Sequence, residues 1–243
     1  MTQTSTTSQN TDSIRVFILS GGKGTRLKSV IKDIPKPMAP IGNLPFLDYL
    51  IRNLKRYGLN KISLLTGYQS IVIEEYFQNV EISVIKESSP LGTGGAIANA
   101  LRYFTEDRYL VINGDTFSSI NLNEFIRLSG KDDSIALQKM ETCDRYGTVK
   151  IDKNRNILEF TEKTLGIKNS YINAGIYLLH RKTLQDNIDL NKFTSLENEV
   201  FPIIALKGVE FDENFIDIGV PEDYLAAQKL IPIWVDQTDP RET

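Results

Sequence analysis

Apolar runs and segments with helical spacing alternate along the first half of the chain. Arg15–Ser20 is a short apolar run, and Pro45–Tyr57 carries apolar residues at helical spacing. The alternation continues with the strand-like "KISLLTGY", "EISVIKE" and "RYLVINGD" and the helix-like "IVIEEYF", "TGGAIANALRYF" and "NLNEFIRLSG". This pattern predicts an α/β fold of three layers, in which a mostly parallel, Rossmann-like sheet carries helices on both faces.

The second half of the chain breaks this rhythm. "SIALQKM", "GTVKID", "ILEFTEK" and "YINAGIYLLH" are strand-like pieces with little helix between them, which predicts a smaller mixed or antiparallel subregion. Helices are expected around Leu196–Leu206 and Glu222–Leu230. We expect a disordered tail at 1–13, a single domain at 14–231 and a C-terminal tail at 232–243.

Composition narrows the class of protein. A chain of 243 residues with 41% hydrophobic content can bury one sizeable core. Its net charge of −3 argues against a broad nucleic-acid surface, and no apolar run reaches the ~18–20 residues that span a bilayer. One cysteine, Cys143, allows no internal disulfide and favours a cytoplasmic protein. The sequence leaves a homo-oligomer open.

Polar residues follow the apolar runs, where an open α/β sheet binds its ligands. They are Gly21–Arg26, Gly67–Tyr68, Glu87–Gly95, Asn113–Asp115, Lys163 and Asp217. Aspartates, glycines and cations dominate this set, while histidine and cysteine contribute nothing to it. Such residues suit Mg²⁺ and phosphate better than zinc or thiol chemistry.

The stretch "VFILSGGKGTRL" is the strongest single candidate for a phosphate site. It matches neither the Walker A motif nor the dinucleotide fingerprint, but it offers unobstructed backbone N–H groups and the guanidinium of Arg26. The alternative is a plain tight turn with solvent-facing charges. Behind it, Pro35, Pro37 and Pro40 stiffen the segment that carries Lys36.

Six segments in order carry a resemblance to a known family. "GGKGTRL…PKPMAPI", "ESSPLGTGGAI", "VINGD", "TEK", "NAGIY" and "FIDIGVPEDY" resemble the signature of the nucleotidyltransferases that join a nucleoside triphosphate to a sugar 1-phosphate. The resemblance extends from Ile14 to about Leu230. "KDIPKPMAPI" and "PLGTGGAI" look most like the guanylyltransferases that act on heptose or mannose 1-phosphates.

The resemblance implies attack of a sugar 1-phosphate oxygen on the α-phosphorus of the triphosphate, with release of pyrophosphate. That oxygen is already ionised, so the reaction needs positioning and charge neutralisation more than a general base. As catalytic residues, Arg26 would neutralise the departing pyrophosphate and Lys36 would reach the α-phosphate. Asp115 and Asp217 would hold the cofactor Mg²⁺.

The resemblance also implies binding residues on both sides of the reaction. The nucleotide-binding residues would be Ser20, Gly21, Gly22, Gly24, Thr25, Glu87, Gly92, Thr93, Asn113 and Gly114. The sugar-phosphate-binding residues would be Gly147, Glu162, Lys163, Asn173 and Gly175. Among them Lys163 would bind the phosphate, and Glu162 would accept a hydrogen bond from a sugar hydroxyl.

The choice of base rests on Glu87. Guanine presents two adjacent N–H donors, which one carboxylate can accept, whereas a uracil or thymine edge suits an amide better. Because the thymidylyl relatives typically show glutamine here, the expected donor is GTP. The resemblance, and not Glu87, implies D-glycero-D-manno-heptose 1-phosphate as the acceptor.

Three rival interpretations remain. The first is uridylyl, cytidylyl or thymidylyl transfer to a hexose 1-phosphate, and the second is a non-catalytic regulatory relative that binds nucleotide sugars. Such a relative would be expected to lose one of the four charged residues Arg26, Lys36, Asp115 and Asp217, all of which are present. The third, a dinucleotide-dependent enzyme, is disfavoured by the glycine loop. His180 is interpreted as structural, and Trp234 would pack on the core or on another subunit.

Overall fold

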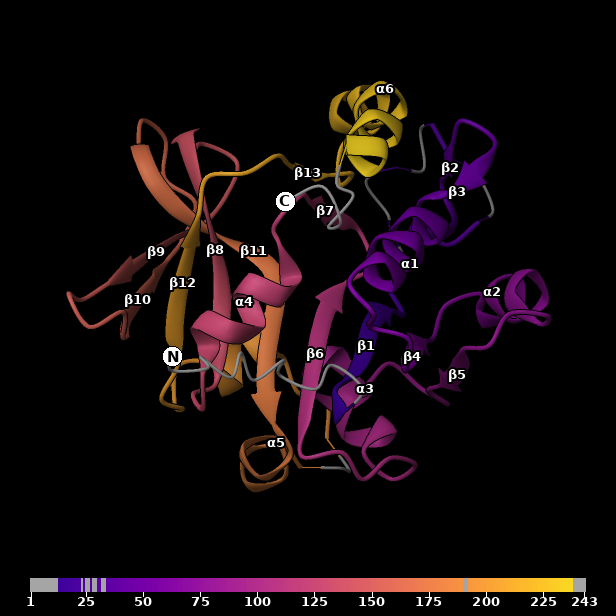
Figure 1. Ribbon diagram of the computed structural model, residues 1–243, viewed down its shortest axis with the longest axis horizontal. Helices are drawn as coiled ribbons and strands as arrows, with labels where there is room; N and C mark the ends of the chain where they lie inside the picture. The colour runs from indigo at the N-terminus through magenta and orange to yellow at the C-terminus, as the bar shows by residue number, and fades with distance from the viewer. Residues whose placement is uncertain are drawn as a thin grey trace, which may run out of the picture.

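One twisted sheet organises the molecule (Figure 1). The computed structural model describes residues 13–22, 24, 27, 30–31, 34–189 and 192–237. Within these residues nine strands form the main sheet, and its parallel part consists of four strands. In spatial order these are β5 (Ser83–Lys86), β4 (Ile62–Thr66), β1 (Arg15–Ser20) and β6 (Arg108–Asn113). The expected parallel sheet is therefore confirmed.

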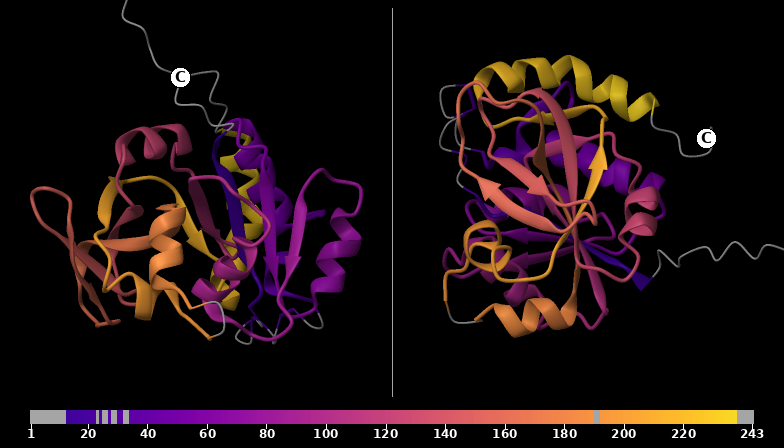
Figure 2. Two further views of the ribbon diagram at one scale, coloured as in Figure 1. Left: turned by 90° about the horizontal axis from the view of Figure 1, so that it is seen from below. Right: turned by 90° about the vertical axis from the view of Figure 1, so that its left-hand side faces the viewer.

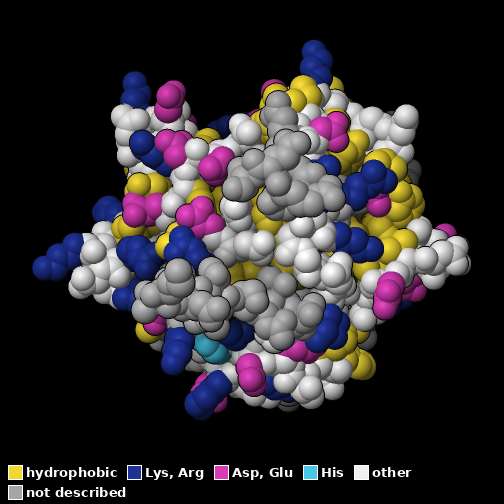
Figure 3. Space-filling model, viewed as in Figure 1, with side chains coloured by type: hydrophobic (Ala, Val, Ile, Leu, Met, Phe, Trp, Pro, Cys, Tyr) yellow, Lys and Arg dark blue, Asp and Glu magenta, His cyan; other side chains and the backbone are white. Residues whose placement is uncertain are grey.

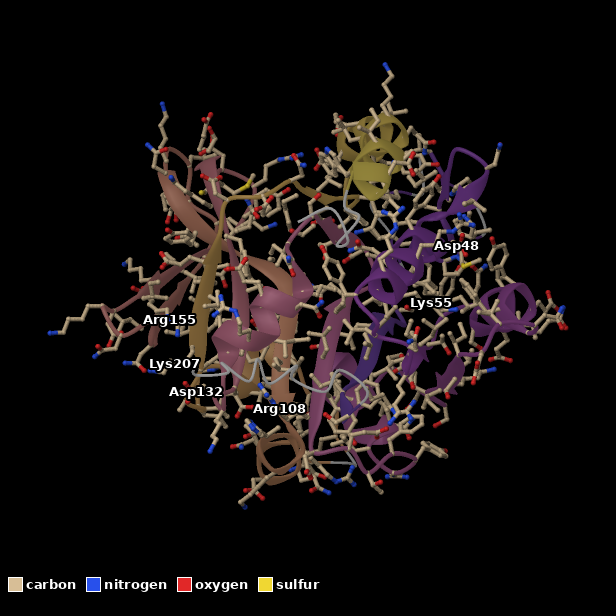
Figure 4. All side chains as sticks on the ribbon, in the orientation of Figure 1. Asp48, Lys55, Arg108, Asp132, Arg155 and Lys207 are labelled. Atoms are coloured by element: carbon tan, nitrogen blue, oxygen red, sulfur yellow. The ribbon has the colours of Figure 1, made fainter. Side chains whose placement is uncertain are left out.

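The antiparallel part of the sheet is built around the long strand β11 (Lys168–His180), which pairs with β6. Its other neighbours are β8 (Ser134–Thr142) and β9 (Thr148–Ile151), while β10 (Ile157–Thr161) pairs with β9 and β12 (Lys207–Phe211) runs parallel to β8. The β9–β10 turn packs against the start of β12, where the labelled Arg155 and Lys207 lie close together (Figure 4). The expected antiparallel subregion is thus confirmed, and it forms one end of the same sheet.

Helices cover both faces of the sheet because side chains alternate along each strand. In β1, Val16 and Ile18 join the core under α1 (Phe46–Arg56), α2 (Ser70–Phe77), α4 (Leu122–Ser129) and α6 (Pro221–Gln237). Phe17 points to the other face and joins the core under α3 (Gly92–Ala100), α5 (Arg181–Asn187) and the π-helical turn η4 (Leu196–Val200). Figure 2 shows α6 as one continuous helix on the outside of this layer.

Short elements complete the fold at the carboxyl ends of the parallel strands. The 3₁₀ turn η3 (Lys36–Met38) follows Pro35, and β2 (Pro40–Ile41) pairs with β3 (Leu44–Pro45). Beyond the end of β6, β7 (Thr116–Ser118) pairs with β13 (Phe215–Asp217) (Figure 1). In this register Asp217 lies opposite Thr116, so the pairing brings Asp217 beside Asp115 from about a hundred residues away in the sequence.

Two helix predictions were wrong in their bounds. The helix expected at 196–206 is confined to η4, since Pro202 follows directly after its end at Val200–Phe201 and cannot continue the backbone hydrogen bonds. The last helix runs on to Gln237, so a C-terminal tail does not begin at residue 232. Burial explains the extension, because Val235 is buried and Trp234 stacks on Phe117.

The distribution of charged side chains on the face drawn in Figure 3 agrees with the small net charge of the chain. In Figure 3 basic and acidic side chains are interspersed over this face, without a continuous basic stripe. Among the described residues, no helix is long and apolar enough to cross a membrane.

Candidate active site

A cavity of about 910 Å³ opens at the carboxyl ends of β1, β4 and β6. It is the site that parallel sheets of this kind offer to ligands, because the strand ends and the loops after them converge there. Ten of the residues predicted from the sequence line it: Gly21, Gly22, Gly24, Lys36, Glu87, Gly92, Thr93, Asn113, Asp115 and Asp217. The fold thus brings the glycine loop, the proline-stiffened lysine and both aspartates to one place.

Lys36 lies between the two aspartates. Its Nζ donates to Asp115 Oδ2 at 2.7 Å and to Asp217 Oδ1 at 3.3 Å, and its side chain is only 12% exposed. The turn η3 fixes the backbone here, and Gly24 packs directly on the lysine. A Cβ at Gly24 would lie 2.7 Å from Lys36 Cβ, and Gly24 has a φ of +56° that favours glycine. The glycine loop and Lys36 therefore form one packed unit.

The two aspartates, Asp115 and Asp217, together favour the binding of a cation. Burial raises the pKa of Asp217, the negative charge of Asp115 raises it further, and Lys36 opposes both effects. Two carboxylates held this close fit Mg²⁺, which commonly takes one or two protein carboxylates and fills its shell with water and substrate phosphate oxygens. The described residues hold no cluster of three or more acidic, histidine or cysteine side chains, so the donor set suits a metal shared with substrate.

Glu87 lines another part of the cavity and packs against two glycines. Its Oε2 accepts a hydrogen bond from Leu91 N at 3.1 Å. Its Oε1 lies over Gly67, where any Cβ would overlap it, and a Cβ at Gly21 would come within 3.1 Å. Burial raises the pKa of this carboxyl, and the bond from Leu91 partly offsets that effect. The result is a fixed acceptor whose second oxygen lies against two glycines.

The amino-terminal end of α3 is tied to the segment 192–197. Thr194 O accepts from Gly94 N at 2.8 Å, which satisfies a donor that would otherwise be free at the start of the helix. The Thr93 hydroxyl donates to Glu197 Oε2 at 2.9 Å and accepts from Leu196 N at 2.8 Å. Thr93, predicted as a nucleotide contact, is therefore also a structural link.

Phe193 and Glu197 are among the cavity residues that the sequence analysis did not single out. Neither follows a strand or belongs to a recognised motif, and only Glu197 falls within the helix that was expected around 196–206. The sequence shows only an aromatic residue in a polar stretch that ends at Pro202, which is too common a pattern to be informative. Both side chains reach the cavity through the backbone contacts of Thr194 with α3.

Next to Asp115, the tip of β6 with Asn113 packs against the part of β11 that carries Asn173 and Gly175. Asn173 Nδ2 donates to the Tyr177 hydroxyl at 2.9 Å, and Asn173 Oδ1 accepts from Gly175 N at 2.7 Å. A Cβ at Gly175 would lie 2.8 Å from Asn113 Nδ2, so the strand β11 passes close to the tip of β6. Complete burial raises the pKa of Tyr177 well above its usual value, which keeps this hydroxyl protonated.

Other predicted residues lie off the cavity wall. Ser20 is buried, with its hydroxyl 3.4 Å from Ile18 O, and Gly114 N donates to Leu19 O at 3.0 Å, so both sit beneath the wall. Glu162 and Lys163 are exposed in the connection between β10 and β11. Gly147 packs against Thr161 O. Thr25 and Arg26 lie outside the described residues. The ligand roles of these residues stay predictions.

His180, the single histidine of the chain, pairs with Asp133 away from the cavity. Its Nδ1 lies 2.9 Å from Asp133 Oδ1, and its backbone N donates to the same oxygen at 2.6 Å. This pairing at the start of α5 agrees with the interpretation of His180 as structural.

Comparison with known proteins adds independent evidence. A sequence model of the family described as nucleotidyl transferase matches residues 15–232. The chain is 43% identical over 217 residues to the D-glycero-alpha-D-manno-heptose 1-phosphate guanylyltransferase of Campylobacter jejuni, covering 87% of this chain and 97% of that relative. The enzyme of the same description from Aneurinibacillus thermoaerophilus is 40% identical over 233 residues, covering 91% of this chain and all of the relative.

Solved structures agree with the sequence relatives. The crystal structure of HddC from Yersinia pseudotuberculosis complexed with GMP-PN matches with a TM-score of 0.80 and 37% identity, covering 88% of this chain and 98% of that one. Both the sequence match and the shared architecture extend over nearly the whole folded region, with the cavity inside it. The chain belongs to the nucleotidyl transferase family.

Proposed function

We propose that the protein transfers GMP from GTP to D-glycero-D-manno-heptose 1-phosphate, giving GDP-heptose and pyrophosphate. The bond that forms joins the sugar phosphate oxygen to the α-phosphorus, and the bond that breaks releases pyrophosphate. The observation that carries this proposal is the arrangement of Lys36, Asp115 and Asp217 in one cavity with Glu87. Their position in one cavity supports a single site in which Lys36 and the aspartates handle phosphate and Glu87 reads the base.

The reaction requires that the negative charges of the substrates are neutralised and that the reacting phosphates are aligned. The attacking phosphate oxygen is ionised at neutral pH, so no side chain has to remove a proton from it. The main barrier is the repulsion between two anionic substrates, which cations placed at the reacting phosphates reduce. Lys36 is held by η3 and Gly24 at the end of the glycine loop, where it can meet the α-phosphate.

Asp115 and Asp217 would hold Mg²⁺. When bound, this ion would draw charge from the α-phosphate and orient the incoming phosphate oxygen. The two aspartates belong to the rigid pair β7–β13 and to the tip of β6, so their separation is set by backbone hydrogen bonds such as Ile218 N to Asp115 O at 3.0 Å. Arg26, outside the described residues, would neutralise the departing pyrophosphate.

Glu87 supports GTP as the donor. An ionised carboxylate accepts hydrogen bonds and donates none, which matches the N1–H and N2 amine of guanine. The Leu91 N–H binds Oε2, and the missing side chains at Gly21 and Gly67 let Oε1 pack closely against their backbone, so the carboxylate is held in one position. The names of the two relatives from Campylobacter jejuni and Aneurinibacillus thermoaerophilus support the heptose acceptor.

Turnover with a panel of substrates tests the proposal. GTP, ATP, UTP, CTP and dTTP are each paired with heptose, mannose and glucose 1-phosphates in the presence of Mg²⁺, and pyrophosphate release is measured. We expect the highest kcat/KM with GTP and D-glycero-D-manno-heptose 1-phosphate. A clear preference for UTP or dTTP would contradict the role given to Glu87, and no turnover with any pair would contradict the proposed activity.

A further inference from the structure

Phe193 is a large apolar side chain at the ligand cavity. It lines the cavity wall, yet 63% of its surface is exposed. Much of the neighbouring rim is polar and includes Glu87, Ser88 and Ser89. An exposed aromatic ring inside a ligand cavity gains most when a flat, weakly hydrated group covers it.

The backbone of Leu91 links Glu87 to the segment that carries Phe193. Leu91 N donates to Glu87 Oε2 at 3.1 Å, and Leu91 O accepts from Thr194 N at 2.8 Å. The Phe193 ring itself reaches Gly92, where a Cβ would lie 3.1 Å from Phe193 Cζ. A ligand whose edge is bound by Glu87 is therefore within reach of the Phe193 ring.

We infer that Phe193 covers one face of the nucleobase whose edge Glu87 binds. The inference rests on the proposed function, because it takes a nucleoside triphosphate as the ligand. Guanine suits both contacts at once, since it offers N–H donors on its edge and a π-surface on its face. Stacking of this kind raises affinity with little choice among bases, so Glu87 would set the selectivity and Phe193 the strength of binding.

Equilibrium binding separates these roles without turnover. GTP is titrated into the protein without the sugar 1-phosphate, and inorganic tripolyphosphate serves as a ligand that lacks the base. In the Phe193→Ala variant the Kd for GTP should rise about 5- to 160-fold, the range for losing one base–aromatic stack. The Kd for tripolyphosphate should not change. Phe193→Tyr and Phe193→Trp should keep the affinity for GTP, and Phe193→Leu should keep only part of it.

Tyr103 supplies a matched control. It is an aromatic residue with 64% exposure that does not belong to the cavity wall. Tyr103→Ala should leave the Kd for GTP unchanged, which excludes a general effect of removing an exposed ring. Melting temperatures of the two alanine variants should stay near that of the wild type, because both side chains are largely in solvent.

The outcomes distinguish this inference from the proposed function. If the wild type binds GTP and Phe193→Ala binds it equally well, the inference on Phe193 is overturned while the activity stands. A rise in the KM for the sugar 1-phosphate with an unchanged Kd for GTP would also overturn it, because the ring would then face the acceptor. If the wild type does not bind GTP, the proposed function and this inference both fail.

Discussion

The ammonium of Lys36 lies 2.7 Å from the carboxylate of Asp115, inside the pair that Asp115 forms with Asp217. The residue expected at the α-phosphate therefore neutralises the two residues expected at the metal. An ammonium and a divalent cation compete for the same oxygens in this arrangement. Lys36 would be released towards the phosphates as the metal takes its place, which couples metal binding to assembly of the catalytic centre.

Lys36→Met should separate the role of Lys36 at the α-phosphate from its role as a competitor of the metal. Turnover should fall at least 100-fold, about 2.7 kcal/mol of lost transition-state stabilisation, because no cation then meets the α-phosphate. Binding of Mn²⁺ to the protein without nucleotide should become several-fold tighter, since the competing ammonium is gone. Calorimetric titration with Mn²⁺ measures the second effect independently of activity.

Lys36→Arg is the control for charge. It keeps a cation beside the aspartates, so the Mn²⁺ affinity should stay close to that of the wild type, although the planar guanidinium should not restore full turnover. An unchanged or weaker Mn²⁺ affinity in Lys36→Met would show that Lys36 and the metal do not share the carboxylates.

Glu87 should give the binding of GTP a characteristic pH dependence. Burial raises the pKa of this carboxyl above its ordinary value of 4.5. GTP binding needs the ionised form, so the Kd for GTP should rise on acidification at a higher pH than an unperturbed glutamate would cause. Glu87→Gln should lower the affinity for GTP at neutral pH and remove this dependence, measured by titration between pH 4.5 and 8.

The same pKa shift has a consequence for stability. A raised pKa means that the folded protein binds the proton more tightly than the unfolded chain, so the ionised carboxylate reduces the stability as the pH rises through the folded-state pKa. Glu87→Gln should therefore melt at a higher temperature than the wild type at pH 7, and the difference should shrink below about pH 4. Glu141→Gln, at an exposed position, should show neither effect.

Gly67 should be needed for the position of Glu87. Any Cβ at residue 67 would overlap Glu87 Oε1, so Gly67→Ala should displace the carboxylate and raise the Kd for GTP about tenfold, the cost of one lost charged hydrogen bond. Gly21→Ala, where the Cβ would lie 3.1 Å from the same oxygen, should have a smaller effect.

A compensating variant controls for misfolding. Gly67→Ala combined with Glu87→Asp shortens the acid and should recover part of the affinity for GTP. If the Kd of Gly67→Ala matched that of the wild type, the carboxylate would not need its present position.

The strand-end rule and the family motifs located the centre of the site because both depend on local sequence. Asp115 follows the end of β6 after a single residue, Gly114, and Lys36 is held by the prolines on either side of it. That Lys36 would contact both aspartates could not be predicted, since it depends on the pairing of β7 with β13. Phe193 and Glu197 could not be predicted for the same reason, because they reach the cavity through backbone contacts between segments far apart in the sequence.

The parallel half of the fold was predictable because its apolar periodicity is strong. Elements with little apolar periodicity, such as α5 and β12, were not predicted. The helix α5 buries only Leu184, so its polar sequence carries no periodic signal. Strand β12 has the short sequence "KGVEF" and pairs in parallel with β8 across a long connection. In both cases tertiary contacts outweigh local propensity.

The carboxyl-terminal extension of α6 should contribute to stability in spite of its proline. Pro232 lies inside the helix, which costs roughly 3 kcal/mol in an isolated helix. Packing beyond it explains why the helix continues, since Val235 is 4% exposed and Trp234 stacks on Phe117 with ring centroids 6.3 Å apart. Val235→Ala removes two buried methyl groups and should lower the free energy of unfolding by about 2 kcal/mol, a fall in Tm of about 4–8 °C. Ile233→Ala on the same helix should lower it by less than about 0.5 kcal/mol, because Ile233 is 51% exposed. Equal melting temperatures for the two variants would mean that the helix beyond residue 231 does not pack on the core in solution.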